Sequence, residues 1–423
     1  MLDLIIRNAT LPDGRNVDIG VRDGLIAVME PHLEGDAGQE IDAKSYLVSP
    51  PFVDSHFHLD YTLTSGLAPA NQSGTLFEGI RNWRSIKPSL TEEGIYERAR
   101  RLCERSLTKG ILAIRSHVDI GDPEFKGVRA LLRLREDLKP WMTIQLVAFP
   151  QDGFFRKPDA EKLFTQALGM GLDVVGGIPH YERSRNEGDR SIHELFRLAA
   201  ENNLLVDMHC DENDDPESRH IETMAACSVK FSLQGRVAGS HLTSMHSMDN
   251  AYADKLISLM AESGVAAIAN PLVNMTLQGR FDTYPRRRGM TRIPELLAAG
   301  IPVGLGHDCV MDPWYGLGSH DMLEVASMAV HGAHMTGADQ ISDCFAGITT
   351  LPARIMHLEN YGLEVGKDAD LIILQANSVM DAIRLRPERL YVLRKGQVIS
   401  TSFPSVSTLY LGNEKTIDAA RGW

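Results

Sequence analysis

The sequence lacks the features of a membrane or secreted protein. Its apolar runs all fall short of the roughly 18 residues that a membrane-spanning helix needs. The first residues, Met1-Leu2-Asp3-Leu4-Ile5, carry no basic region and no cleavage site. The five cysteines form no CxxC pair and no regular spacing, which argues against a disulfide framework. We therefore expect a cytoplasmic protein without a targeting signal or a membrane span.

Positive charge is scarce as well. The chain has 43 Lys and Arg against 56 Asp and Glu, which gives a net charge of −13. Because nucleic-acid binders gather Lys and Arg on one face, DNA or RNA is not an expected partner. Internal repeats and low-complexity segments are also missing. At 423 residues the chain can form one large globular domain and a smaller one.

What the sequence does contain is a pair of histidines at the end of an apolar run. Residues 46–53 are typical of a buried strand, and Asp54-Ser55-His56-Phe57-His58-Leu59-Asp60 follows directly. Side chains at alternate strand positions point to one face, so the imidazoles of His56 and His58 converge. Two converging imidazoles make half of a tetrahedral metal site, although an isolated pair could equally be hydrogen-bonded core histidines.

Apolar segments alternate with helical patterns along the middle of the chain. One helical pattern, 92–109, ends at Gly110, and Ser191 starts another with a capping box. Eight strands in such alternation predict a (β/α)8 barrel, with a doubly wound open sheet as the alternative. The predicted strands cover 46–58, 111–119, 142–151, 172–180, 204–211, 236–242, 265–271 and 301–308.

Both ends of the chain differ from the middle in their sequence pattern. They contain short predicted strands joined by hairpin-turn dipeptides such as Asp13-Gly14. Neither end is long enough to build a good core alone. We expect residues 1–47 and 359–423 to pair into one small β-sandwich beside a barrel domain spanning 48–358.

Histidine and aspartate recur where the predicted strands end. His56 and His58 follow the first strand, His209 the fifth, His241 the sixth and Asp308 the eighth. The C-terminal ends of barrel strands share one rim, so these side chains predict a metal site there. Three neutral imidazoles and one carboxylate leave room for a water, whose pKa a divalent ion lowers towards about 7. The predicted ligands are His56, His58, His209 and Asp308.

One metal is favoured over two. A second metal in this architecture usually needs a carboxylated lysine on the fourth strand, and residues 172–180 contain no lysine. His117 and His180 also fall near strand ends. We interpret His117 as core packing or, alternatively, as a pocket residue.

These motifs resemble the amidohydrolase superfamily, and specifically the bacterial cytosine deaminase family. The similarity runs nearly the whole length, and its most family-specific stretches are 270–285 and Asp312-Pro313-Trp314. The segments that carry it are 54–60, 147–151, 177–180, 209–212, 270–274, 277–285, 306–315 and 366–371.

The resemblance implies an enzyme that deaminates a free amino-pyrimidine base with a metal-bound hydroxide and releases ammonia. His56, His58, His209 and Asp308 would hold one Zn(II) or Fe(II). Asp308 would also accept a proton from the attacking water. We expect a small-molecule substrate and a homo-oligomer.

The other matched positions receive roles in proton transfer and substrate binding. Glu212 would carry the proton to ring nitrogen N3, and His241 would orient the hydroxide. Gln151, helped by the backbone near Leu76, would hold the base, and Trp314 would line the pocket.

One position departs from the family pattern. Members that act on cytosine typically carry two consecutive aspartates, whereas here Asp308 is followed by Cys309. A smaller, weakly polar thiol beside C5 of the ring favours 5-methylcytosine over cytosine. The alternatives are plain cytosine deamination, an amidohydrolase reaction on isoguanine or a related amino-heterocycle, and a catalytically silent relative. The PCxxC signature of nucleoside and nucleic-acid deaminases is missing.

Overall fold

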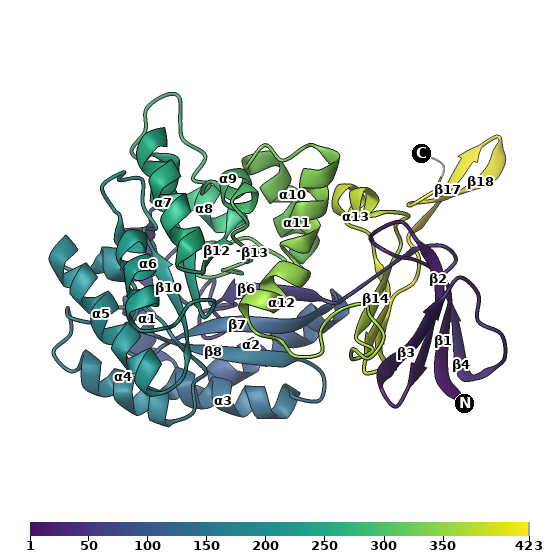
Figure 1. The fold of residues 1–423 in the computed structure, drawn as a ribbon, viewed down its shortest axis with the longest axis horizontal. Helices are drawn as coiled ribbons and strands as arrows, with labels where there is room; N and C mark the ends of the chain where they lie inside the picture. Colours follow the sequence, from purple (N-terminus) through teal and green to yellow (C-terminus); the bar gives the residue numbers. More distant parts are fainter. Residues whose placement is uncertain (422–423) are drawn as a thin grey trace.

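The computed structural model describes residues 1–421 and contains two large sheets (Figure 1). One is an all-parallel sheet in the middle of the chain, and the other is built from both chain ends. Residues 422 and 423, the last two of the predicted C-terminal segment 359–423, lie outside the described residues.

The parallel sheet has eight strands, each paired with its sequence neighbour. A parallel bridge between Phe57 and Asp308 joins the last strand region to the first, so the sheet closes on itself. The predicted (β/α)8 barrel is confirmed, and the open-sheet alternative is wrong. The strands are β6 (Phe52–Phe57), β7 (Ile111–Asp119), β8 (Thr143–Phe149), β9 (Val174–Val175), β10 (Leu205–Cys210), β11 (Val237–His241), β12 (Val265–Ala269) and β13 (Val303–Leu305).

The first predicted strand, 46–58, is in fact two strands. β5 (Leu47–Ser49) belongs to the sheet of the chain ends, where it pairs with β14 (Leu371–Leu374), and β6 starts the barrel. Pro50-Pro51 separates them. Proline has no N–H for a strand ladder, so the chain leaves one sheet at this point and enters the other.

Helices cover the barrel and make most of the connections between its strands (Figure 1). α2 (Glu92–Thr108) agrees with the predicted helical pattern 92–109 and buries Ile95, Ala99 and Leu102. The predicted start of a helix at Ser191 is wrong, because the Ser184 hydroxyl already accepts the Glu187 N–H as N-cap of α5. The remaining helices are α1 (Leu76–Ile86), α3 (Lys126–Leu138), α4 (Ala160–Gly169), α5 (Arg185–Glu201), α6 (His220–Lys230), α7 (Asn250–Glu262), α8 (Pro271–Leu277), α9 (Ile293–Ala298), α10 (Met322–Gly332), α11 (Ala338–Ala346), α12 (Thr350–Ile355) and α13 (Val379–Leu385).

The two chain ends pair in one eight-stranded sheet, as the sequence predicted. Its order is β16-β15-β14-β5-β1-β2-β3, with β4 beside β1, and Leu4, Ile19 and Leu371 lie in its core. Besides β5 and β14, its strands are β1 (Leu2–Thr10), β2 (Asn16–Arg22), β3 (Leu25–Glu30), β4 (Ala37–Asp42), β15 (Arg389–Arg394) and β16 (Gln397–Thr401). β17 (Val406–Leu411) and β18 (Asn413–Asp418) form a separate hairpin. Among residues 1–421, no helix has the length and apolar character needed to cross a membrane.

Candidate active site

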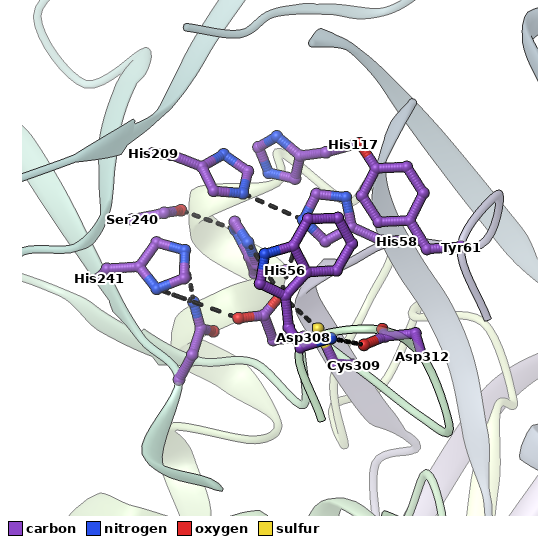
Figure 2. Close-up of polar contacts among 12 residues, drawn as sticks. His56, His58, Tyr61, His117, His209, Ser240, His241, Asp308, Cys309 and Asp312 are labelled. Carbon is purple, nitrogen blue, oxygen red and sulfur yellow. Dashed lines mark hydrogen bonds and ion pairs between the residues drawn. The ribbon is translucent and has the colours of Figure 1, made fainter. Parts of the chain in front are cut away.

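Four side chains from three strand ends meet at one rim of the barrel (Figure 2). The Nε2 atoms of His58 and His209 are 3.0 Å apart. Asp308 Oδ1 lies 3.6 Å from Nε2 of His56 and 3.6 Å from Nε2 of His58. We call His56, His58, His209 and Asp308 the metal cluster. The structure therefore brings together the four residues that the sequence predicted as ligands.

The metal cluster fits a divalent cation. His56 is fully buried, and its Nε2 has no hydrogen-bond partner among the described residues. Burial lowers the pKa of His58 to about 3 and, with the neighbouring imidazoles, holds the pKa of His56 and His209 well below the ordinary value. The imidazoles are therefore in the neutral form that binds metals. Burial, followed by the charge of Glu212, raises the pKa of Asp308, so its carboxylate needs a cation nearby to stay ionised.

A buried polar relay fixes the orientation of His56. The Ser240 hydroxyl donates to Asp207 Oδ1 at 2.6 Å and therefore accepts from His56 Nδ1 at 2.9 Å. The Nε2 lone pair of His56 is thereby aimed at the metal cluster. Asp207 is held in turn by Arg115 at 2.9 Å. Asp207 and Ser240 were not predicted from the sequence, although Asp207 stands two residues before His209 on the same strand face.

His241 and Glu212 face the metal cluster from its open side. His241 Nδ1 accepts from Asn274 Nδ2 at 2.9 Å and lies 3.5 Å from Glu212 Oε1 and 4.0 Å from Asp308 Oδ2. Burial raises the pKa of Glu212 to about 8, so this carboxyl group can hold a proton at neutral pH. His241 and Asp308 have φ of 73° and 69°, a left-handed conformation that is strained for both residue types. Strain at two strand ends on the same rim of the barrel is typical of a functional site.

The metal cluster opens into a small cavity. All four residues predicted to contact substrate line it, together with Glu212 and His241. They are Leu76, Gln151, Cys309 and Trp314. His117 does not line it. It is fully buried, with its ring 4.2 Å from that of His56, which fits the interpretation as core packing.

His117 also forms a second group of potential ligands with His56 and Asp207, whose donor atoms lie within 4.8 Å of one another. Asp207 already pairs with Arg115, so its charge is neutralised without a second cation. The arrangement thus favours a single metal.

Beside His58 lies an aromatic wall made of Tyr61, Trp83 and Trp314. The Tyr61 ring is parallel to the His58 ring within 5°, at a centroid distance of 4.7 Å. It also contacts Trp83 at 4.2 Å and Trp314 at 5.0 Å. Of these three residues, only Trp314 was predicted from the sequence. Tyr61 and Trp83 lie in the segment after β6 and on α1, where no strand periodicity marks them.

Cys309 lies between two carboxylates at the edge of the cavity. Its Sγ is 3.5 Å from Asp308 Oδ1. Burial, together with Asp308 and Asp312, raises the pKa of the thiol well above its ordinary value, so the side chain is neutral. Burial also raises the pKa of Asp312 to about 6. Asp312 accepts the Trp314 N–H at 2.9 Å, which ties the loop of Cys309 to the aromatic wall.

Comparisons with known proteins agree with this geometry. Residues 39–401 match the model of the amidohydrolase family. The chain is 32% identical over 409 residues to an N-isopropylammelide isopropyl amidohydrolase of Pseudomonas sp. strain ADP, covering 94% of this chain and 97% of that protein. It is 31% identical to a pterin deaminase of Rhizobium rhizogenes, covering 93% of this chain and 90% of that protein.

A solved structure gives a stronger match. The crystal structure of a 5-methylcytosine deaminase from Klebsiella pneumoniae, liganded with phosphonocytosine, superposes with a TM-score of 0.92 at 40% sequence identity. The match covers 95% of this chain and 99% of that one. With its closed parallel barrel, its buried cluster of metal-binding side chains and a family match over most of its length, the chain belongs to the amidohydrolase family.

Proposed function

We propose that the protein hydrolyses the exocyclic amine of a free amino-pyrimidine base, with 5-methylcytosine preferred over cytosine. The observation that carries the proposal is one cavity that is lined by Glu212, by Gln151 and by three members of the metal cluster, which are His58, His209 and Asp308. The 40% identity to the Klebsiella 5-methylcytosine deaminase structure supports this substrate class.

Several residues of the site have a chemical task in this reaction. Water adds to C4 of the ring, a C–O bond forms, and the C–N bond to the amine breaks to give thymine and ammonia. Asp308 accepts one proton of the water, and Glu212 gives its own proton to N3. Glu212 then takes up the proton of the hydroxyl group now on C4 and delivers it to the leaving amine, and the proton on Asp308 passes to Glu212 to restore the starting state. His241, held by Asn274, orients the attacking water. A divalent cation, when bound in the metal cluster, supplies the Lewis acidity that makes water nucleophilic near neutral pH.

The preference for a 5-methyl group rests on Cys309. Its neutral thiol lines the cavity where cytosine-acting relatives typically carry a second aspartate. An apolar methyl group packs against a thiol without desolvating a charge. Such a fit is worth about 1–3 kcal/mol, or roughly 10–200-fold in kcat/KM.

Ammonia release tests this proposal directly. We expect the wild-type enzyme to favour 5-methylcytosine over cytosine by about 10–200-fold in kcat/KM. Cys309→Asp puts a third carboxylate beside Asp308 and Asp312 and should shift the preference towards cytosine. Cys309→Ser, which keeps the size and neutrality of the side chain, is the matched control and should leave the ratio closer to wild type.

Two results would contradict the proposal at different levels. If kcat/KM for cytosine is at least as high as for 5-methylcytosine, and Cys309→Asp does not shift the ratio, the proposed preference for a 5-methyl group is wrong. An enzyme that releases ammonia from neither base is not a pyrimidine deaminase.

A second candidate is the deamination of a larger amino-heterocycle. Its support is the 31% identity to a pterin deaminase and the 32% identity to an N-isopropylammelide amidohydrolase. Including pterin, isoguanine and an aminotriazine in the same ammonia assay decides between the two candidates. Elemental analysis of the purified protein decides between Zn(II) and Fe(II) as the proposed cofactor.

A further inference from the structure

Tyr61 is a buried residue of the cavity that none of the reaction steps above uses. It is 1% exposed, and its hydroxyl donates to Gln151 Oε1 at 2.9 Å. Among residues 1–421, Gln151 is the only recorded hydrogen-bond partner of this hydroxyl. The contact links the aromatic wall to the amide that faces the base.

The hydrogen bond has a defined direction. A phenol, with an ordinary pKa of about 10, carries its proton at neutral pH and must donate it when it is buried. Gln151 Oε1 accepts that proton, so the Nε2 amino group is the end of the amide left to face the cavity. In a flipped amide, two donors would meet or the phenol proton would have no acceptor. Tyr61 therefore selects one of the two amide orientations.

Tyr61 itself has little freedom to move. Its ring contacts His58, Trp83 and Trp314 at centroid distances of 4.7, 4.2 and 5.0 Å. Its backbone carbonyl accepts from Thr64 Oγ1 at 2.6 Å. The phenol is thus a fixed reference point for the Gln151 amide, which is itself only 4% exposed.

We propose that Tyr61 is a positioning residue that locks Gln151 with its amino group towards the substrate. The pocket then accepts amino-heterocycles that present a carbonyl oxygen at this edge and disfavours those that present an amino group there. This inference rests on the proposed function and narrows its substrate class to 2-oxo bases. The preference of the pocket for an oxygen at this edge of the substrate then depends on Tyr61, a residue that does not need to touch the reacting carbon.

The test compares two bases that differ at that edge. 5-Methylcytosine has an oxygen at C2, and 2,4-diamino-5-methylpyrimidine has an amino group there. With metal-loaded Tyr61→Phe, Gln151 is free to flip. We expect KM for 5-methylcytosine to rise about 10-fold while kcat changes less, and the preference for the 2-oxo base to fall by about 10-fold or more. The matched control is Tyr96→Phe, which removes a hydroxyl that donates to Asp137 outside the site. It should change neither KM nor the preference for the 2-oxo base.

A double-mutant cycle separates positioning from packing. If Tyr61 acts through Gln151, Tyr61→Phe should have little further effect on KM in a Gln151→Leu background. Additive losses in the cycle, or an equal loss for both bases, would overturn the inference. A wild-type enzyme that releases ammonia from no base would instead overturn the proposed function, whereas an active wild type with an unchanged ratio in Tyr61→Phe overturns only the role of Tyr61.

Discussion

The metal cluster and the aromatic wall are built in different ways. The metal cluster lies at the ends of β6, β10 and β13, and a chain of buried polar contacts orients His56. The aromatic wall lies on α1 and on loops, and ring contacts dominate its packing. Strand ends of a closed barrel are fixed relative to one another by the sheet, whereas loops and short helices can change without disturbing it.

This difference separates two kinds of function. Metal binding and proton transfer need atoms held within a few tenths of an ångström, which the barrel rim supplies. Substrate choice needs a surface that can be reshaped, which the aromatic wall and the Cys309 loop supply. Variants of the first region should therefore abolish the reaction, and variants of the second should change which base reacts and how tightly.

The largest effect is expected from the metal cluster. His209→Ala removes one imidazole and leaves an incomplete donor set, so bound metal and turnover should both be lost. Elemental analysis and ammonia release measure the two properties on the same sample. His32→Ala, an exposed histidine near Asp18 in the sheet of the chain ends, is the control and should keep both. Full stoichiometric metal in an inactive His209→Ala protein would show that His209 is not a ligand.

Glu212→Gln should affect chemistry without affecting metal. It keeps the size of the side chain but removes the acid that carries the proton, so turnover should fall by about 10²-fold or more while metal content stays at the wild-type level. Glu217→Gln, in the exposed part of the same loop, is the matched control. Loss of metal in Glu212→Gln, or turnover close to wild type, would give Glu212 a different role.

The sequence was sufficient for the part of the site that follows strand geometry. His56, His58, His209 and Asp308 could be predicted because apolar runs mark the strands and a barrel puts all strand ends on one rim. The same rule could have found Asp207, which shares a strand face with His209. Its partner Ser240 could not be found in this way, because a serine beside a histidine has no distinctive pattern until the neighbouring strand is paired.

The aromatic wall was beyond such reasoning. Tyr61 and Trp83 meet only because α1 returns over the end of β6, and this depends on tertiary packing rather than on periodicity. The error at residues 46–58 has a different cause. Pro50-Pro51 was present as a signal, but a continuous apolar run on both sides concealed the change from one sheet to the other.

The smallest effect is expected from a single methyl group added behind the aromatic wall. Gly79 lies on α1, and a Cβ there would come within 2.4 Å of Trp314 Cδ1. Alanine is favoured over glycine by about 1 kcal/mol inside a helix, but overpacking a filled site costs about 1–3 kcal/mol. In Gly79→Ala the displacement of Trp314 should therefore dominate, raising KM severalfold with metal content unchanged and a slightly lower Tm. Gly169→Ala, at the end of α4 where an added Cβ meets nothing within 4 Å, is the matched control and should leave KM at its wild-type value. If Gly79→Ala lost metal as well, the aromatic wall and the metal cluster would be coupled, and the separation between metal binding and substrate choice would not hold.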